Sequence, residues 1–142
     1  MKKITLFLFC TTALASALGI NAPHSEKIPD SIAYELVLTN AAPNPTLLIA
    51  AVGLTGSDRT SAEKIIKDFA FDKQAHTDAL KAGHENFEQY RNKCHELVSF
   101  ARVQLKAKLT RAGAIRFDTY VQHEKIHMQK HTASPLLGGV ES

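Results

Sequence analysis

Residues 80–105 read LKAGHENFEQYRNKCHELVSFARVQL, with an apolar or small side chain at every third or fourth position. This spacing predicts one apolar seam along a helix, of the kind that packs in helical bundles and coiled coils. The seam comprises Leu80, Gly83, Phe87, Tyr90, Cys94, Leu97, Ala101 and Leu105. Upstream, the same periodicity predicts a buried face formed by Ala62, Ile65, Ile66 and Phe69.

One continuous helix over residues 57–109 would be about 80 Å long at about 1.5 Å per residue, too long for a compact domain of this size. We therefore expect a break at Ala82-Gly83-His84, where Gly83 terminates the first helix in a left-handed conformation. At the start of that helix, Ser57 or Thr60 is the expected cap. Residues 60–63 read TSAE, which has the form of a capping box.

Shorter helices are expected before this segment. Asp30 or Ser31 can cap one, which ends before the prolines of residues 43–45. Its apolar positions are Ile32, Ala33, Leu36 and Val37. Residues 46–54 form an apolar run that fits a helix or a strand, and their Leu and Ala content favours a helix.

A turn at Leu109-Thr110-Arg111 precedes the last helix, which we expect from Ala112 to His131. Its predicted core face contains Ala114, Phe117, Val121 and Met128. No strand-like alternation interrupts these patterns. The sequence thus predicts an all-α fold: an antiparallel helical bundle of three long helices plus one or two short N-terminal helices, after a cleavable signal peptide.

The first 19 residues have the form of a secretory signal peptide: Lys2 and Lys3, a short apolar stretch, then small residues. Cleavage is expected between residues 15 and 22. Phe9 stands before Cys10 where a lipoprotein signal needs a small residue, so we expect no lipid anchor. The predicted order is completed by an extended lead-in over residues 20–29, a helical bundle domain over 30–131 and a flexible tail over 132–142.

Removal of the signal peptide changes the composition of the 142-residue chain. Two lysines and no acidic residue are lost, which lowers the formal charge from +3 to +1. Cys10 is lost as well, leaving Cys94 as the single cysteine. The mature chain can then form no internal disulfide, and no later apolar stretch is long enough to span a membrane. We expect an exported protein, periplasmic or extracellular.

Three segments carry a resemblance to known proteins. Ile28-Pro29-Asp30 with Tyr34, the Gly53-Leu54-Thr55 turn and residues 109–122, LTRAGAIRFDTYVQ, resemble small exported, all-helical bacterial proteins of uncharacterised function. The resemblance implies an exported helical fold and no particular activity.

Residues 123–127 read HEKIH, which matches the H-E-x-x-H pattern of zinc hydrolases. In that alternative, His123 and His127 bind zinc and Glu124 is the general base. Lys130 and Ala133 stand where an extended zinc site needs glycine and histidine. On a helical wheel His123 points well away from the predicted core face and His127 lies on its flank. We therefore predict no catalytic residue, metal ligand or cofactor, and keep zinc hydrolysis as the alternative.

Other chemistry is weaker in the sequence. Cys94-His95 lacks the upstream cysteine of a haem attachment motif, and we expect Cys94 to be a buried thiol. A haem or metal carrier would need axial ligands such as His76 or His84 facing the last helix. Arg102, Lys106, Lys108 and Arg111 cluster near one predicted helix end, which we attribute to the helix dipole and to a solvated face.

The favoured function is non-enzymatic binding of an unidentified protein or envelope component. A near-neutral exported chain does not suit nucleic acid. A periplasmic chaperone-like bundle is a further alternative, although the expected L-T-x-x-Q repeats are missing. The apolar seam also fits assembly with a second copy of the chain.

Overall fold

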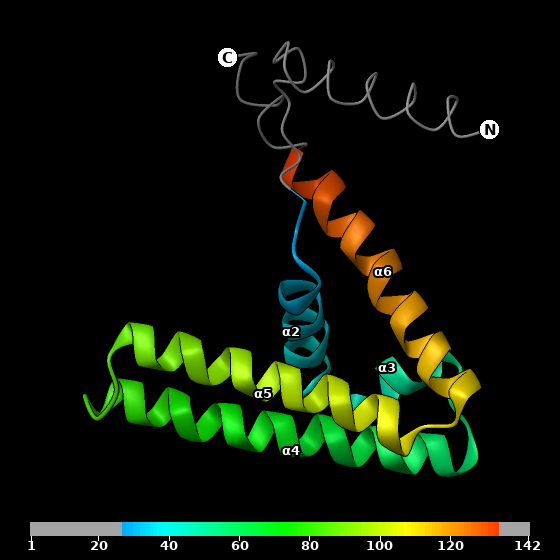
Figure 1. Cartoon of the computed structure of the whole chain (residues 1–142), viewed down its shortest axis with the longest axis horizontal. Coiled ribbons are helices and arrows are strands. Elements are labelled where there is room, and N and C mark those ends of the chain that lie inside the picture. Colours follow the sequence, from blue (N-terminus) through cyan, green and yellow to red (C-terminus); the bar gives the residue numbers. More distant parts are fainter. Residues whose placement is uncertain (1–26, 134–142) are drawn as a thin grey trace, which may run out of the picture. The chain divides into compact units, whose positions relative to one another are not determined.

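The computed structural model describes residues 27–133, and five helices account for most of them (Figure 1). The helices are α2 (Asp30–Ala41), α3 (Pro45–Val52), α4 (Gly56–Lys81), α5 (Phe87–Lys108) and α6 (Arg111–Ala133). No strand occurs in this part of the chain. The predicted all-α fold, with three long helices after two short ones, is confirmed. The expected signal peptide, most of the lead-in and the tail beyond residue 133 lie outside the described residues.

Residues Ile28–Met128 form one compact unit that holds the core and every site considered below. Within it, α4 and α5 run antiparallel and pack along each other (Figure 1). None of the helices in the described range has the length and apolarity that a membrane crossing requires.

The apolar seam of α4 and α5 is buried where α2 covers it. All four residues of the predicted α4 face are buried, as are Cys94, Val98, Ala101 and Leu105 on α5. The seam prediction is wrong near the turn between α4 and α5. Gly83 is exposed there, and the exposed fraction of Phe87 is 66%. There the hairpin extends past α2, so no third helix among residues 27–133 covers its surface (Figure 1).

The break between α4 and α5 falls at the predicted glycine. Gly83 has φ of 78°, and its N–H donates to the carbonyl of Leu80 at 3.1 Å. The N–H of His84 reaches back to the carbonyl of Ala79 at 2.9 Å. These two bonds satisfy the last carbonyls of α4 in a Schellman arrangement, which requires a left-handed residue.

The predicted capping box is wrong, and another was missed. α4 begins at Gly56, and the Thr60 hydroxyl donates to the Gly56 carbonyl at 3.4 Å inside the helix. The actual capping box joins Asn86 and Gln89 at the start of α5. Its first residue is Asn instead of Ser or Thr, which a search for the serine or threonine form overlooks.

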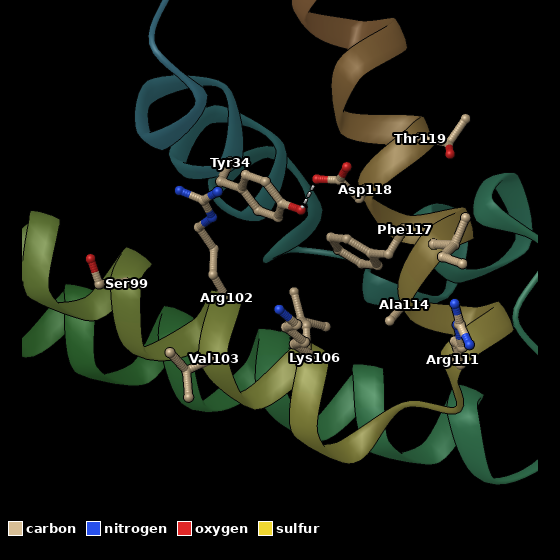
Figure 2. Close-up of a pocket in the computed structure, with 12 residues that line it drawn as sticks. Tyr34, Ser99, Arg102, Val103, Lys106, Arg111, Ala114, Phe117, Asp118 and Thr119 are labelled. Atoms are coloured by element: carbon tan, nitrogen blue, oxygen red, sulfur yellow. Dashed lines mark hydrogen bonds between the residues drawn. The ribbon is translucent and has the colours of Figure 1, made fainter.

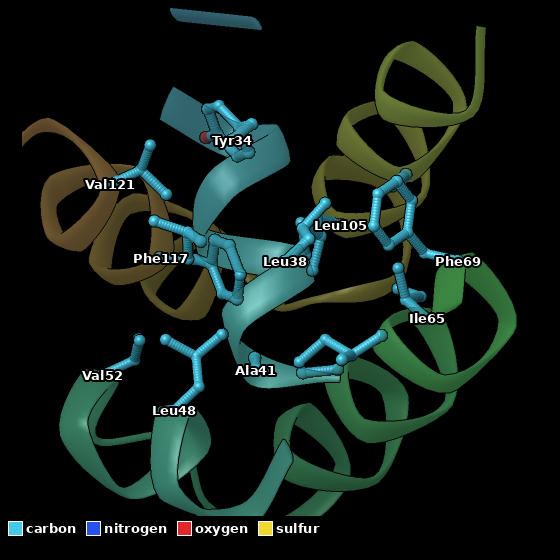
Figure 3. Packing of buried hydrophobic residues seen from close by; sticks show 14 of the residues in the cluster. Tyr34, Leu38, Ala41, Leu48, Val52, Ile65, Phe69, Leu105, Phe117 and Val121 are labelled. Carbon is cyan, nitrogen blue, oxygen red and sulfur yellow. The ribbon is translucent and has the colours of Figure 1, made fainter. Parts of the chain in front are cut away.

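The short helix α2 packs on both helices of the hairpin. Its buried face consists of Ala33, Tyr34, Val37, Leu38 and Ala41, several of which are drawn in Figure 3. Ala33 and Val37 were expected there, whereas Leu36 is exposed. The prediction that Asp30 or Ser31 caps α2 is wrong, because Pro29 occupies the N-cap position and no side chain caps the helix. The Asp30 carboxylate instead binds side chains of α6.

The ambiguous apolar run forms the helix α3, which ends at the left-handed Gly53. The predicted face of α6 is confirmed: Phe117 and Val121 are buried, and Ala114 and Met128 pack against the core. α6 leans away from α5 instead of lying along it (Figure 1).

Candidate binding cleft

A cleft of about 1010 Å³ lies between α5 and α6, with Tyr34 of α2 at its base (Figure 2). It exists because only Leu109 and Thr110 separate the two helices, which then diverge. The lining residues are Tyr34, Ser99, Arg102, Val103, Leu105, Lys106, Arg111, Ala114, Ile115, Phe117, Asp118 and Thr119.

The base of the cleft is an ordered aromatic contact. The Tyr34 ring stacks on Phe117, with 6.3 Å between ring centroids and 19° between the planes. Its hydroxyl donates to Asp118 Oδ1 at 2.6 Å (Figure 2). Burial, and then this hydrogen bond to a carboxylate, raise the pKa of Tyr34 well above its ordinary value. Tyr34 therefore stays neutral and links α2 to α6.

The cleft carries more positive than negative charge. The Arg102 guanidinium lies over the Tyr34 ring, 4.6 Å from its centroid, which is a cation–π distance. Lys106 and Arg111 form no ion pair with any acidic side chain of residues 27–133. Asp118 is the single acidic lining residue, and it accepts the Tyr34 hydroxyl. The site thus presents cations that lack carboxylate partners.

Arg111 corrects the interpretation drawn from the sequence. Lys106 and Lys108 lie in the last turn of α5, where the helix dipole favours cations. Arg111 instead begins α6, whose first turn has no acidic residue, so the dipole there disfavours its charge. The helix dipole therefore does not explain Arg111.

Both walls also expose apolar side chains. Val103 on α5 is 61% exposed, and Ile115 on α6 is 57% exposed. Isolated exposed apolar residues are common, but these two line the same cleft as the three cations. The cleft therefore combines apolar and cationic surface on each wall.

Polar contacts hold the start of α6. Asp58 in the first turn of α4 accepts hydrogen bonds from the Thr110 N–H at 2.7 Å and the Thr110 hydroxyl at 2.5 Å. These bonds lower the pKa of Asp58. The Thr110 hydroxyl oxygen in turn accepts from the Gly113 N–H at 3.1 Å, and Arg116 donates to the Gly53 carbonyl at 3.1 Å. Asp58 thus supplies the negative charge that the first turn of α6 lacks.

A second set of contacts holds α6 farther along. Asp30 accepts from Lys125 Nζ at 2.8 Å and from Gln122 Nε2 at 3.2 Å. The hydrogen bond from Lys125, followed by that from Gln122, lowers the pKa of Asp30. Polar contacts thus join α6 to α2 in addition to those at its start.

The H-E-x-x-H residues lie outside this cleft. The rings of His123 and His127 meet edge to face with centroids 4.5 Å apart, and the His123 side chain is 66% exposed. Glu124 Oε1 lies 3.6 Å from His123 Nδ1 and lines a separate pocket beside Leu47. Within residues 27–133, no three His, Cys, Asp or Glu side chains are grouped so as to hold a metal ion.

The remaining chemical candidates are in the hairpin. Cys94 is buried, as expected, and burial raises the pKa of its thiol. His76 Nδ1 lies 2.7 Å from Glu85 Oε1, so the imidazole is engaged at the α4–α5 turn. His84 lies exposed in that same turn.

Comparisons with models of protein families, with curated proteins and with solved structures found no significant match to this chain. The site must therefore be interpreted from its own geometry. Sequence reasoning identified Arg102, Lys106 and Arg111 as a cluster but not as the walls of a cleft. The available signal was the cation at position 111, the last residue of the predicted turn and directly before the predicted helix.

Proposed function

We propose that this chain is an exported, non-enzymatic binding protein whose α5–α6 cleft receives an anionic ligand with apolar surface. The observation that carries the proposal is the pairing of unpartnered cations with exposed apolar side chains on both walls of one cleft. Convergent charged groups set among apolar residues are typical of ligand sites. The signal-like pattern of residues 1–19 supports export to the periplasm or beyond, and the ligand there is an unidentified protein or envelope component.

The chemistry of the lining residues favours binding over catalysis. Tyr34 is the most buried ionisable group of the cleft, and its hydroxyl donates to Asp118 with a raised pKa. It is therefore poorly suited to act as a base or nucleophile. The hydroxyls of Ser99 and Thr119 line the cleft without a histidine among its lining residues to activate them.

A fluorescent probe tests the proposal. Anilinonaphthalene sulfonate combines one anionic group with aromatic rings, so the wild-type protein should bind it with an increase in fluorescence. Lys106→Glu/Arg111→Glu should weaken this binding roughly tenfold or more by turning attraction into repulsion. Both side chains are exposed, so the variant should keep the helical circular dichroism of the wild type.

The matched control is Lys81→Glu/Arg91→Glu, which makes the same change of charge in exposed residues of the hairpin away from the cleft. It should bind the probe as the wild type does. Equal losses in the two variants, or no binding by the wild type, would contradict the proposed function.

Zinc hydrolysis is the second candidate, favoured by the adjacent rings of His123 and His127. It predicts stoichiometric zinc after dialysis against a weak chelator, and loss of that zinc in His123→Ala. Protein that retains no zinc would exclude this candidate and leave binding in the cleft as the function to pursue.

A further inference from the structure

We propose that the ligand of the α5–α6 cleft is an acidic amphipathic helix of a partner protein. The inference rests on the proposed function and names the class of occupant. It follows from the form of the cleft, from the length of its walls and from the charges that line it.

The form of the cleft favours a segment of a macromolecule. Small-molecule sites usually occupy about 300–1,000 Å³ and bury 70–90% of the ligand surface. This cleft has a volume of about 1010 Å³, at the upper end of that range, and is open to solvent. A small amphiphile lying in it would leave much of its surface in water, whereas a longer segment could contact both walls at once.

The walls have the dimensions of a helix-binding groove. The α5 wall extends from Ser99 to Lys106 and the α6 wall from Arg111 to Thr119, which is about two turns of each helix. Helices that bind in grooves use apolar side chains at positions i, i+3, i+4 and i+7, which span the same two turns. The Tyr34–Phe117 stack provides an ordered aromatic base for such side chains.

The charges specify an acidic partner. Lys106 lies one turn after Arg102 on α5, and Arg111 lies one turn before Ile115 on α6. A neutral or basic helix would remove water from these cations without supplying counter-charges. Desolvation of an unpaired charge is unfavourable, so such a helix would bind weakly. Glutamate side chains flanking the apolar face would pair with Lys106 and Arg111, and would offset the unfavourable position of Arg111 at the start of α6.

The experiment uses two fluorescein-labelled helical peptides of about 18 residues with the same leucine positions at i, i+3, i+4 and i+7. One carries glutamate and the other lysine on the flanking positions. Fluorescence anisotropy with the wild-type protein should show binding of the glutamate peptide that is at least roughly tenfold tighter than that of the lysine peptide. Lys106→Glu/Arg111→Glu should reverse the preference, while Lys81→Glu/Arg91→Glu should keep it.

The outcomes separate this inference from the proposed function. If the sulfonate probe binds in the cleft and neither peptide does, the helix inference is wrong and a small amphiphile remains the ligand. If neither the probe nor the peptides bind, both proposals fail. Sedimentation of the unliganded protein tests for self-association. If the wild type self-associates and Lys106→Glu/Arg111→Glu abolishes this, the occupant of the cleft is a second copy of the chain, and the inference is wrong.

Discussion

The α4–α5 hairpin and the helix α6 are of similar length but are attached to the core in different ways. The two helices of the hairpin pack along each other, and their apolar seam is buried where α2 covers it. α6 contributes two fully buried side chains, Phe117 and Val121, together with a few partly buried ones. Hydrogen bonds to Asp30 and Tyr34, and that of Asp58 to the preceding Thr110, add to this attachment. The pocket between α4 and α5 has a volume of about 340 Å³, whereas the cleft between α5 and α6 has about 1010 Å³. Close packing of two helices therefore leaves less space for a ligand than a helix that leans away.

Hydrogen bonds and buried side chains contribute differently to the stability of these two regions. A hydrogen bond typically contributes about 0.5–1.5 kcal/mol net, and less where water competes for its partners. Removing a buried aromatic side chain costs about 3–5 kcal/mol. The attachment of α6 therefore depends more on its few buried side chains, of which Phe117 is the largest, than on its hydrogen bonds.

The largest effect is expected for Phe117→Ala. It should lower the free energy of unfolding by about 3–5 kcal/mol, a large share of the about 5–15 kcal/mol typical of a domain. Hydrogen exchange should accelerate more in α6 than in α4 and α5. Urea denaturation and exchange mass spectrometry measure the two effects. Ile126→Ala, which truncates an exposed residue of the same helix, is the control. Uniform acceleration along the chain would show that α6 is not attached separately.

A smaller effect is expected at the start of α6. A Cβ atom added to Gly113 would clash with Asp58 Oδ2, which is bound to Thr110. Gly113→Ala should therefore lower the urea concentration at the unfolding midpoint, because it displaces that carboxylate from Thr110. The cycle with Asp58→Ala provides the control, because Gly113→Ala should cost nothing further once the carboxylate is absent. Additive losses in the cycle would rule out this contact as the cause.

The smallest effect is a pH dependence at the α2–α6 contact. Because the pKa of Asp30 is lowered in the folded protein, its contribution to stability is present above the ordinary value of 3.8 and is lost as the pH falls through the lowered value. Urea denaturation between pH 2 and 6 should show a shallower decrease for Asp30→Asn than for the wild type. Asp72→Asn, an exposed acid on α4, should follow the wild-type curve. Coincident curves for Asp30→Asn and wild type would show that this contact adds no pH dependence.

Much of the hairpin could be predicted from the sequence because its determinants are local. The buried face of α4 follows from helical spacing, and Gly83 can terminate a helix because it lacks a side chain. Phe87 lies on the same periodic seam yet is exposed, since periodicity gives the face of a helix but not the length over which another helix covers it.

The cleft could not be predicted in the same way. It depends on the angle between α5 and α6, which is set by contacts between residues far apart in the chain, such as Asp58 with Thr110 and Asp30 with Lys125. An aspartate at the start of a helix often caps it, so the sequence pattern predicts a cap at Asp30. Its actual partner, Lys125, lies 95 residues away and leaves no local signal. The prediction that His123 points away from the core needed only the helical repeat, and His123 is exposed. His127, predicted on the flank of the core face, is exposed as well.

The contact between Asp58 and Thr110 also has a consequence for folding kinetics. It joins the first turn of α4 to the residue before α6 across a separation of 52 residues, which include the whole hairpin. Closing so long a loop is entropically unfavourable until α4 and α5 have paired and brought its ends together. Docking of α6 should therefore follow the rate-limiting step. Substitutions at this contact should then speed unfolding and leave the folding rate nearly unchanged, whereas those in the hairpin seam should slow folding.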